Sequence, residues 1–124
     1  MSKEPTMRRR AMLTCIIPLL LLLAKEARAH ALLDRAEPRV GNTVATAPRQ
    51  VTLWFTQKVE PASSSITVTN AAGQRVDAGK IRVSGSQMSV SLRSGGPGIY
   101  TVTWHVRSLD EHTTEGNFTF KVGP

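Results

Sequence analysis

Residues 99–106 read Ile-Tyr-Thr-Val-Thr-Trp-His-Val, so large apolar residues stand at alternate positions along most of the stretch. A period of two is typical of a β-strand that buries one face. The face predicted to be buried consists of Tyr100, Val102, Trp104 and Val106. His105 falls on the opposite face, so we expect it to be an ordinary outward-facing strand residue and not a ligand.

Shorter stretches with the same alternation lie on either side of this strand. They predict strands at residues 51–56, 65–69, 80–83 and 88–92, and a last strand in which Phe118, Phe120 and Val122 face inward. Turn-forming residues such as Asn70-Ala-Ala-Gly73 separate them, and no segment has the apolar period of a helix. About seven short strands in this arrangement predict an all-β fold, a Greek-key β-sandwich of the immunoglobulin-like kind.

The first 29 residues have the anatomy of a signal peptide. Three arginines precede an apolar run from Ala11 to Ala24, which is shorter than the roughly 20 residues of a membrane-spanning helix. Ala27-Arg-Ala29 has the small-x-small form of a cleavage site. We expect residues 1–29 to be removed on export to the periplasm. Residues 30–124 then form one mature domain that begins at His30 and has no membrane span.

Charge and cysteine content exclude several classes of function. Without segment 1–29 the formal net charge falls from +7 to +3. The remaining basic residues are scattered singly, which argues against nucleic acid as a partner. Cys15 is the only cysteine and leaves with the signal peptide, so a metal site in the mature chain has to use nitrogen and oxygen ligands.

Cleavage before His30 would place a free α-amino group beside an imidazole. These two nitrogens can chelate one metal ion together, and the pair suits Cu(II), which prefers tetragonal nitrogen and oxygen surroundings. A cut before a histidine also arises by chance, so this terminus alone does not identify a metal site.

Asp110 and His112 form a second pair of candidate ligands, just after the strand at 99–106. In extended backbone both side chains would point to one side and offer an oxygen and a nitrogen, while Glu111 would point away. Asp-x-His is common in surface turns, so this pair gains its weight only together with His30. Met88 is expected to pack in the core, and the mature sequence has no methionine cluster suited to Cu(I).

Familiar catalytic motifs are missing from the sequence, and we expect the protein not to be an enzyme. There is no Gly-x-Ser-x-Gly, no phosphate-binding glycine loop and no His-Glu-x-x-His. One enzymatic hypothesis stays open, because copper-dependent polysaccharide monooxygenases also use a histidine brace on a β-sandwich. Against it, Asp110 would fill a position that their chemistry leaves open. A metal-free immunoglobulin-like interaction module is a third hypothesis.

Four motifs together resemble the periplasmic copper-resistance protein C family, CopC. They are His30-Ala-Leu-Leu, Glu37-Pro-Arg-Val-Gly, Val51-Thr-Leu-Trp-Phe-Thr, and Trp104-x-Val-x-Ser-x-Asp-x-His with Gly116-x-Phe-x-Phe-x-Val. The resemblance spans essentially the whole mature chain. It implies a periplasmic copper carrier or buffer whose Cu(II) ion is held by the α-amino group and imidazole of His30, the Asp110 carboxylate and the His112 imidazole. It also implies a copper-transporting inner-membrane protein as partner.

Two departures from the family pattern bear on that site. Many relatives have a glutamate that helps to hold the terminal amine, at the position where this chain has Gln57. An amide can accept a hydrogen bond from the amine but adds no negative charge, and Glu60 is a candidate to compensate. The Met-rich Cu(I) loop of some relatives is missing as well, which implies a member with only the Cu(II) site.

Overall fold

The structure of the protein is a computed structural model, and it describes residues 31–93 and 95–124. The predicted signal segment and His30 lie outside these described residues. In the described part of the chain, no helix is both long and apolar enough to cross a membrane.

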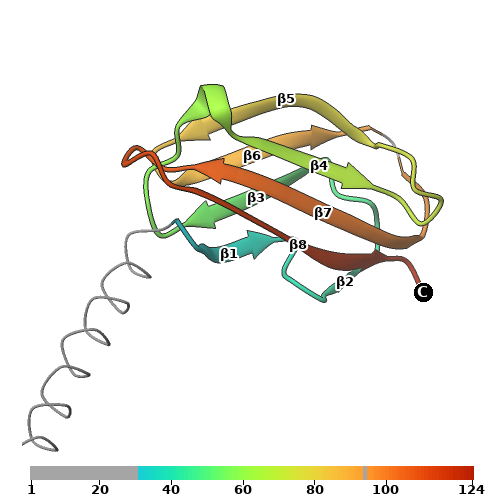
Figure 1. The fold of residues 1–124 in the computed structure, drawn as a ribbon. Helices are drawn as coiled ribbons and strands as arrows, with labels where there is room; N and C mark the ends of the chain where they lie inside the picture. Colours follow the sequence, from blue (N-terminus) through green and yellow to red (C-terminus); the bar gives the residue numbers. More distant parts are fainter. Residues whose placement is uncertain (1–30, 94) are drawn as a thin grey trace, which may run out of the picture.

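Eight strands form two four-stranded sheets that pack face to face (Figure 1). The first sheet has the order β1-β3-β6-β5, with β1 (Leu33–Glu37), β3 (Gln50–Phe55), β6 (Gln87–Leu92) and β5 (Asp77–Ser84). The second has the order β2-β8-β7-β4, with β2 (Thr43–Val44), β8 (Thr113–Val122), β7 (Gly98–Arg107) and β4 (Ser65–Thr69). A short 3-10 helix, η1 (Pro61–Ser63), lies between β3 and β4.

The order of the strands confirms the predicted sandwich. Only β5–β6 and β7–β8 are neighbours both along the chain and within a sheet, and the other connections cross between the sheets. Crossing connections of this kind place the apolar faces of both sheets on one shared core.

The core consists of the apolar faces that the alternating pattern predicts. Phe55 and Trp104 come from opposite sheets and meet edge to face, with ring centroids 5.1 Å apart. Tyr100 stacks on Phe120 at 5.3 Å. Met88 is fully buried, as its predicted packing role requires. Burying one such side chain contributes about 1.5–3 kcal/mol, so these contacts are the main favourable contribution to the stability of the sandwich.

The β7–β8 hairpin sets the position of the loop that carries Asp110 and His112. Arg107 pairs with Thr113 at the loop end of the hairpin, and the antiparallel pairing runs unbroken to Gly98 and Val122. Opposite Trp104 stands Gly116, where a Cβ atom would lie only 2.6 Å from Cζ2 of the indole. A residue without a side chain is therefore needed there to leave room for the Trp104 indole.

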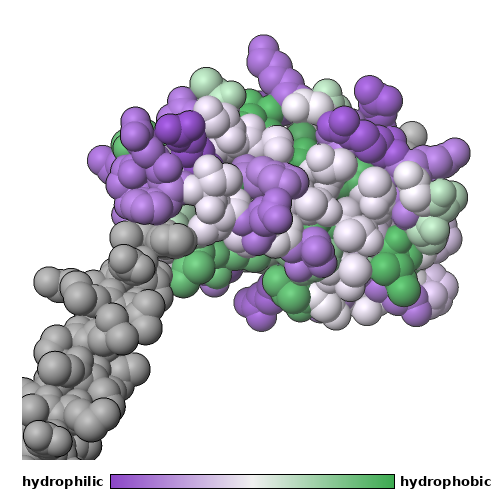
Figure 2. All heavy atoms as spheres, in the orientation of Figure 1, coloured by the Kyte–Doolittle hydropathy of each residue, from purple (hydrophilic) through white to green (hydrophobic). Residues whose placement is uncertain are grey.

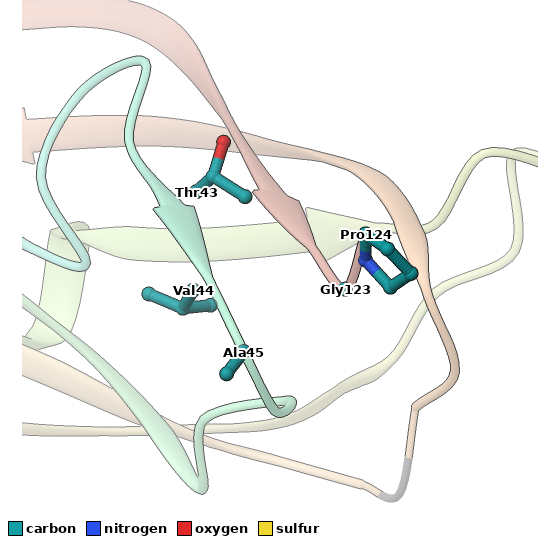
Figure 3. Close-up of a pocket in the computed structure, with 5 residues that line it drawn as sticks. All are labelled: Thr43, Val44, Ala45, Gly123 and Pro124. Carbon is teal, nitrogen blue, oxygen red and sulfur yellow. The ribbon is translucent and has the colours of Figure 1, made fainter.

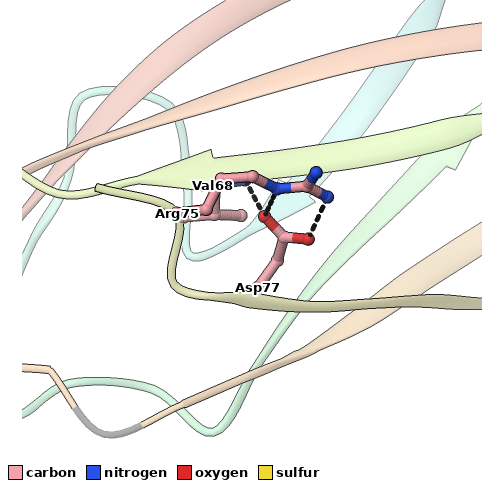
Figure 4. Close-up of polar contacts among 3 residues, drawn as sticks. All are labelled: Val68, Arg75 and Asp77. Carbon is pink, nitrogen blue, oxygen red and sulfur yellow. Dashed lines mark hydrogen bonds and ion pairs between the residues drawn. The ribbon is translucent and has the colours of Figure 1, made fainter. Parts of the chain in front are cut away.

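A buried carboxylate ties the edge strands of the two sheets together (Figure 4). Asp77, the first residue of β5, is 3% exposed and accepts a hydrogen bond from the backbone N–H of Val68 on β4 at 2.8 Å. Arg75 donates to the same carboxylate through Nε at 3.2 Å and Nη2 at 2.8 Å. Burial raises the pKa of Asp77, but these hydrogen bonds and the Arg75 charge outweigh it and hold the pKa below its usual value.

Candidate metal centre

The loop between β7 and β8 is a tight turn. The N–H of Ser108 donates to the carbonyl of His112 at 2.9 Å, and the N–H of Glu111 donates to the carbonyl of Ser108 at 3.0 Å. Glu111 has a φ of 70°, in the left-handed region. The prediction of extended backbone from Asp110 to His112 is therefore wrong, because hydrogen bonds within the loop favour a turn.

The turn nevertheless brings the two predicted ligands together. Oδ2 of Asp110 lies 3.3 Å from Nδ1 of His112, and both side chains are about half exposed. Neighbouring ligand atoms that each bind one first-row metal ion at about 2 Å lie roughly 3 Å apart. The oxygen and the nitrogen are thus close enough to bind the same ion, and their chemistry fits Cu(II).

Asp110 is held as an anion by its neighbours. The hydroxyl of Ser108 donates to Oδ1, and this hydrogen bond is the largest cause that lowers the pKa of Asp110. Desolvation acts against it, while the ring and backbone of His112 lower the pKa further. A carboxylate that stays deprotonated at neutral pH is ready to bind a cation.

The chain that follows His30 is anchored beside this turn. Ala31 is fully buried, and its carbonyl accepts a hydrogen bond from Oγ1 of Thr114 at 2.6 Å. Leu32 donates to Oγ1 of Thr56 at 2.9 Å and accepts from the N–H of Thr56 at 2.9 Å. Thr114 stands two residues after His112 on the chain, so the anchor lies next to the candidate ligands.

Residues 31–93 and 95–124 contain no cluster of three or more His, Cys, Asp or Glu side chains arranged to hold a metal. Two of the three predicted ligands are described, and His30 lies outside. Figure 2 shows hydrophilic side chains gathered at the end of the molecule where the β7–β8 loop lies. The described part of the chain therefore contains two of the three residues that the predicted site requires.

Other charged residues near the turn have partners of their own. Glu111 faces Arg107, with 3.9 Å between Oε1 and Nη2. Glu60 caps η1, where its Oε1 accepts from the N–H of Ala62 at 3.3 Å, and hydrogen bonding led by Ser63 lowers its pKa. Gln57 is exposed. The Glu60 carboxylate, which we expected to compensate for Gln57, is thus engaged in capping η1.

The remaining histidine and one shallow hollow lie outside the candidate site. His105 is outward facing, as predicted, and its Nε2 lies 2.8 Å from Oε2 of Glu115 across the hairpin. A shallow hollow of about 430 Å³ is lined by Thr43, Val44, Ala45, Gly123 and Pro124 (Figure 3). It lies at the far end of β8, about 30 Å from the turn at the usual rise per strand residue, and has no charged side chain among its lining residues.

Two hydroxyl residues of the site were not predicted to have a role. Ser108 and Thr114 hold Asp110 and Ala31 respectively. Serine is common in tight turns because its hydroxyl can bond to nearby backbone groups, but this local signal does not single out Asp110 as the partner of Ser108. Nothing in the sequence could pair Thr114 with Ala31, since they lie 83 positions apart.

The fold and the turn define a class: a small β-sandwich that carries nitrogen and oxygen donors at one end of its longest hairpin. The family whose description is CopC domain matches residues 33–123, most of the chain. The chain belongs to the CopC family, and the resemblance drawn from its motifs is confirmed.

Individual relatives agree with this assignment. The chain is 34% identical over 105 residues to Protein YobA of Escherichia coli K12, covering 82% of this chain and 85% of YobA. It is 32% identical to the copper transport protein CutJ of Bacillus subtilis, over 84% of this chain but only 20% of CutJ. The crystal structure of CopC from Methylosinus trichosporium OB3b superposes with a TM-score of 0.72 at 32% identity, covering 77% of this chain and 95% of that one.

Proposed function

We propose that this protein is a periplasmic Cu(II)-binding carrier or buffer. The ion is held by the α-amino group and imidazole of a processed His30, by the Asp110 carboxylate and by the His112 imidazole. Copper is the cargo, and no reaction is catalysed on it. Membership of the CopC family supports copper as the metal, and the nitrogen and oxygen donors favour Cu(II) over Cu(I).

One observation carries the proposal: the anchor of Ala31 on Thr114 stands beside the Asp110 and His112 pair. Consecutive α-carbons lie about 3.8 Å apart, so a chain that begins one residue before Ala31 starts next to this anchor. Proteolysis would then create the two nitrogen ligands of His30 close to the Asp110 carboxylate and the His112 ring. A metal-free interaction module would not require the predicted cut to fall beside two candidate ligands.

A copper-transporting inner-membrane protein is the proposed partner. CutJ supports this, because the part of CutJ that matches this chain is one fifth of a protein named for copper transport. In this chain the same kind of domain would hand its ion to a separate membrane protein.

The test compares two versions of the mature protein. One begins at His30, and the other carries one additional alanine before it, so that His30 keeps its ring but loses its free amine. Both are titrated with Cu(II) while electron paramagnetic resonance is recorded. We expect tight one-to-one binding with a tetragonal signal only in the first, because only there can the amine and the ring chelate together.

The outcomes also separate the open alternatives. Equal binding by both versions, or none by either, would contradict the proposed site and favour the metal-free interaction module. Turnover of chitin or cellulose by the copper-loaded protein with a reductant would instead support the histidine-brace enzyme.

A further inference from the structure

Ser108 is the one buried residue of the β7–β8 turn at 108–112, and its backbone is held on both sides. It is 1% exposed and forms a β-bridge with Val59, in the segment that follows β3. Its N–H and its carbonyl both take part in the hydrogen bonds that close the turn, to His112 and Glu111. The side chain of Ser108 therefore starts from a rigid backbone.

The hydroxyl of Ser108 acts on one oxygen of Asp110. It donates to Oδ1, and the carbonyl of His112 lies 3.2 Å from the same hydroxyl. A hydroxyl has a single proton to donate, and an ionised carboxylate is a stronger acceptor than a neutral carbonyl. Oδ1 is therefore engaged with the turn, while Oδ2 faces Nδ1 of His112 at 3.3 Å.

We propose that Ser108 is the positioning residue of the metal site and makes Asp110 a ligand through Oδ2 alone. The inference rests on the proposed copper function. By binding Oδ1, Ser108 fixes the rotation of the carboxylate and keeps Oδ2 directed to the side where His112 offers its nitrogen. Without the hydroxyl, the exposed carboxylate can rotate and present either oxygen, so binding copper would first have to order it.

The experiment uses the processed protein that begins at His30, with Ser108→Ala as the variant. Ser89→Ala is the control, because Ser89 lies in the middle of β6, paired with Thr52 and Arg82. Cu(II) affinity is measured by competition with a chelator of known strength. We expect Ser108→Ala to bind about tenfold more weakly, the lower end of the effect of residues that orient a ligand, with an altered copper hyperfine splitting. Ser89→Ala should keep both values.

A double-mutant cycle with Asp110→Ala separates positioning from a general structural role. If Ser108 acts through Asp110, Ser108→Ala causes no further loss of affinity once the carboxylate is gone. Urea unfolding of each metal-free variant shows whether it folds, and Ser108→Gly, which also lacks the hydroxyl, replaces Ser108→Ala if that variant does not fold.

The failures can be told apart. Unchanged affinity in Ser108→Ala, or the same loss with and without the Asp110 carboxylate, overturns the positioning role while copper binding stands. Absence of Cu(II) binding by the unaltered processed protein overturns the proposed function, and the positioning role with it.

Discussion

Thr114 joins two distant parts of the chain through one hydroxyl, which donates to the carbonyl of Ala31. Thr114→Val keeps the size and branching of the side chain but removes the donor. We expect the free energy of unfolding to fall by about 1–3 kcal/mol, because the carbonyl of a buried residue loses its partner. Cu(II) affinity should fall about tenfold, since the processed terminus is held less firmly.

Urea unfolding and a chelator competition measure these two effects. Thr113→Val is the matched control, because Thr113 is the exposed neighbour on the same strand. If both variants behave alike, the bond to Ala31 does not hold the terminus.

Substitution of Asp77 should lower the stability of the sandwich without changing Cu(II) binding at the proposed site. Asp77→Asn removes the charge that faces Arg75 and keeps the shape of the side chain. We expect about 1–3 kcal/mol less stability at neutral pH, measured by urea unfolding. Cu(II) binding should be unaffected, because β5 begins at the opposite end of the first sheet from the segment that meets Ser108.

The pH dependence of this loss has a definite sign. The pKa of Asp77 is lowered in the folded protein, so its carboxylate stabilises the fold above its unfolded pKa of about 3.9. That contribution is lost as the pH falls through the lower folded pKa. Unfolding curves of the unaltered protein and Asp77→Asn should therefore converge in strong acid, and a constant gap down to that range would contradict the assignment.

At the scale of the elements, the close contact between β7 and β8 at Gly116 should control the shape of the hairpin. Gly116→Ala places a methyl group against the Trp104 indole, where the distance would be 2.6 Å. Overpacking of this kind costs about 1–3 kcal/mol. We expect a lower midpoint of urea unfolding and a changed near-ultraviolet circular dichroism signal from the tryptophan. Gly96→Ala, where a methyl group meets open space, is the control.

The strands with regular alternation could be predicted from the sequence, and the others could not. β7 buries every second side chain, and β3 buries Val51, Leu53 and Phe55 at alternate positions with Thr52 between them, so both carry a strong apolar alternation in the sequence. β1 reads Leu-Asp-Arg-Ala-Glu with an irregular pairing to β3 after Leu33, so its pattern is broken. β2 has only two residues. β8 buries the predicted Phe118, Phe120 and Val122, but it starts as early as Thr113, and its polar first half carries no apolar alternation that could mark that start.

Part of the candidate site could also be predicted from the sequence. Asp110 and His112 stand in a recognisable motif, and their contact follows from the turn that joins two paired strands. Their backbone geometry was predicted wrongly, because hydrogen bonds inside a five-residue loop leave no trace in residue spacing. The hydrogen bond between Thr114 and Ala31 requires the first residues of β1 and of β8 to lie at the same end of the sandwich, and this arrangement is known only from the fold.

For the whole molecule, copper should act as a link that exists only in the folded state. The proposed ion joins the processed terminus to the turn of the longest hairpin, so it binds the native protein more tightly than the unfolded chain, which keeps only the chelating nitrogens of the terminal histidine. At a free Cu(II) concentration one hundred times the Kd, such binding adds at most about 2.7 kcal/mol of stability, because any binding to the unfolded chain reduces the gain. Thermal unfolding should move to higher temperature for the protein that begins at His30, whereas the version with an additional alanine should show a much smaller shift.

The complete burial of Ala31 has a consequence for how long the proposed terminus would survive in the presence of peptidases. An aminopeptidase has to draw several residues of loose chain into its cleft, but the folded body starts one residue after the predicted cut, where Ala31 and Leu32 are already bonded to Thr114 and Thr56. A terminal histidine left by the predicted cut would thereby be shielded from trimming by the fold that begins at Ala31. Mass spectrometry after aminopeptidase treatment should find His30 retained in the native protein and removed in urea, and rapid loss from the native protein would show that the terminus is loose.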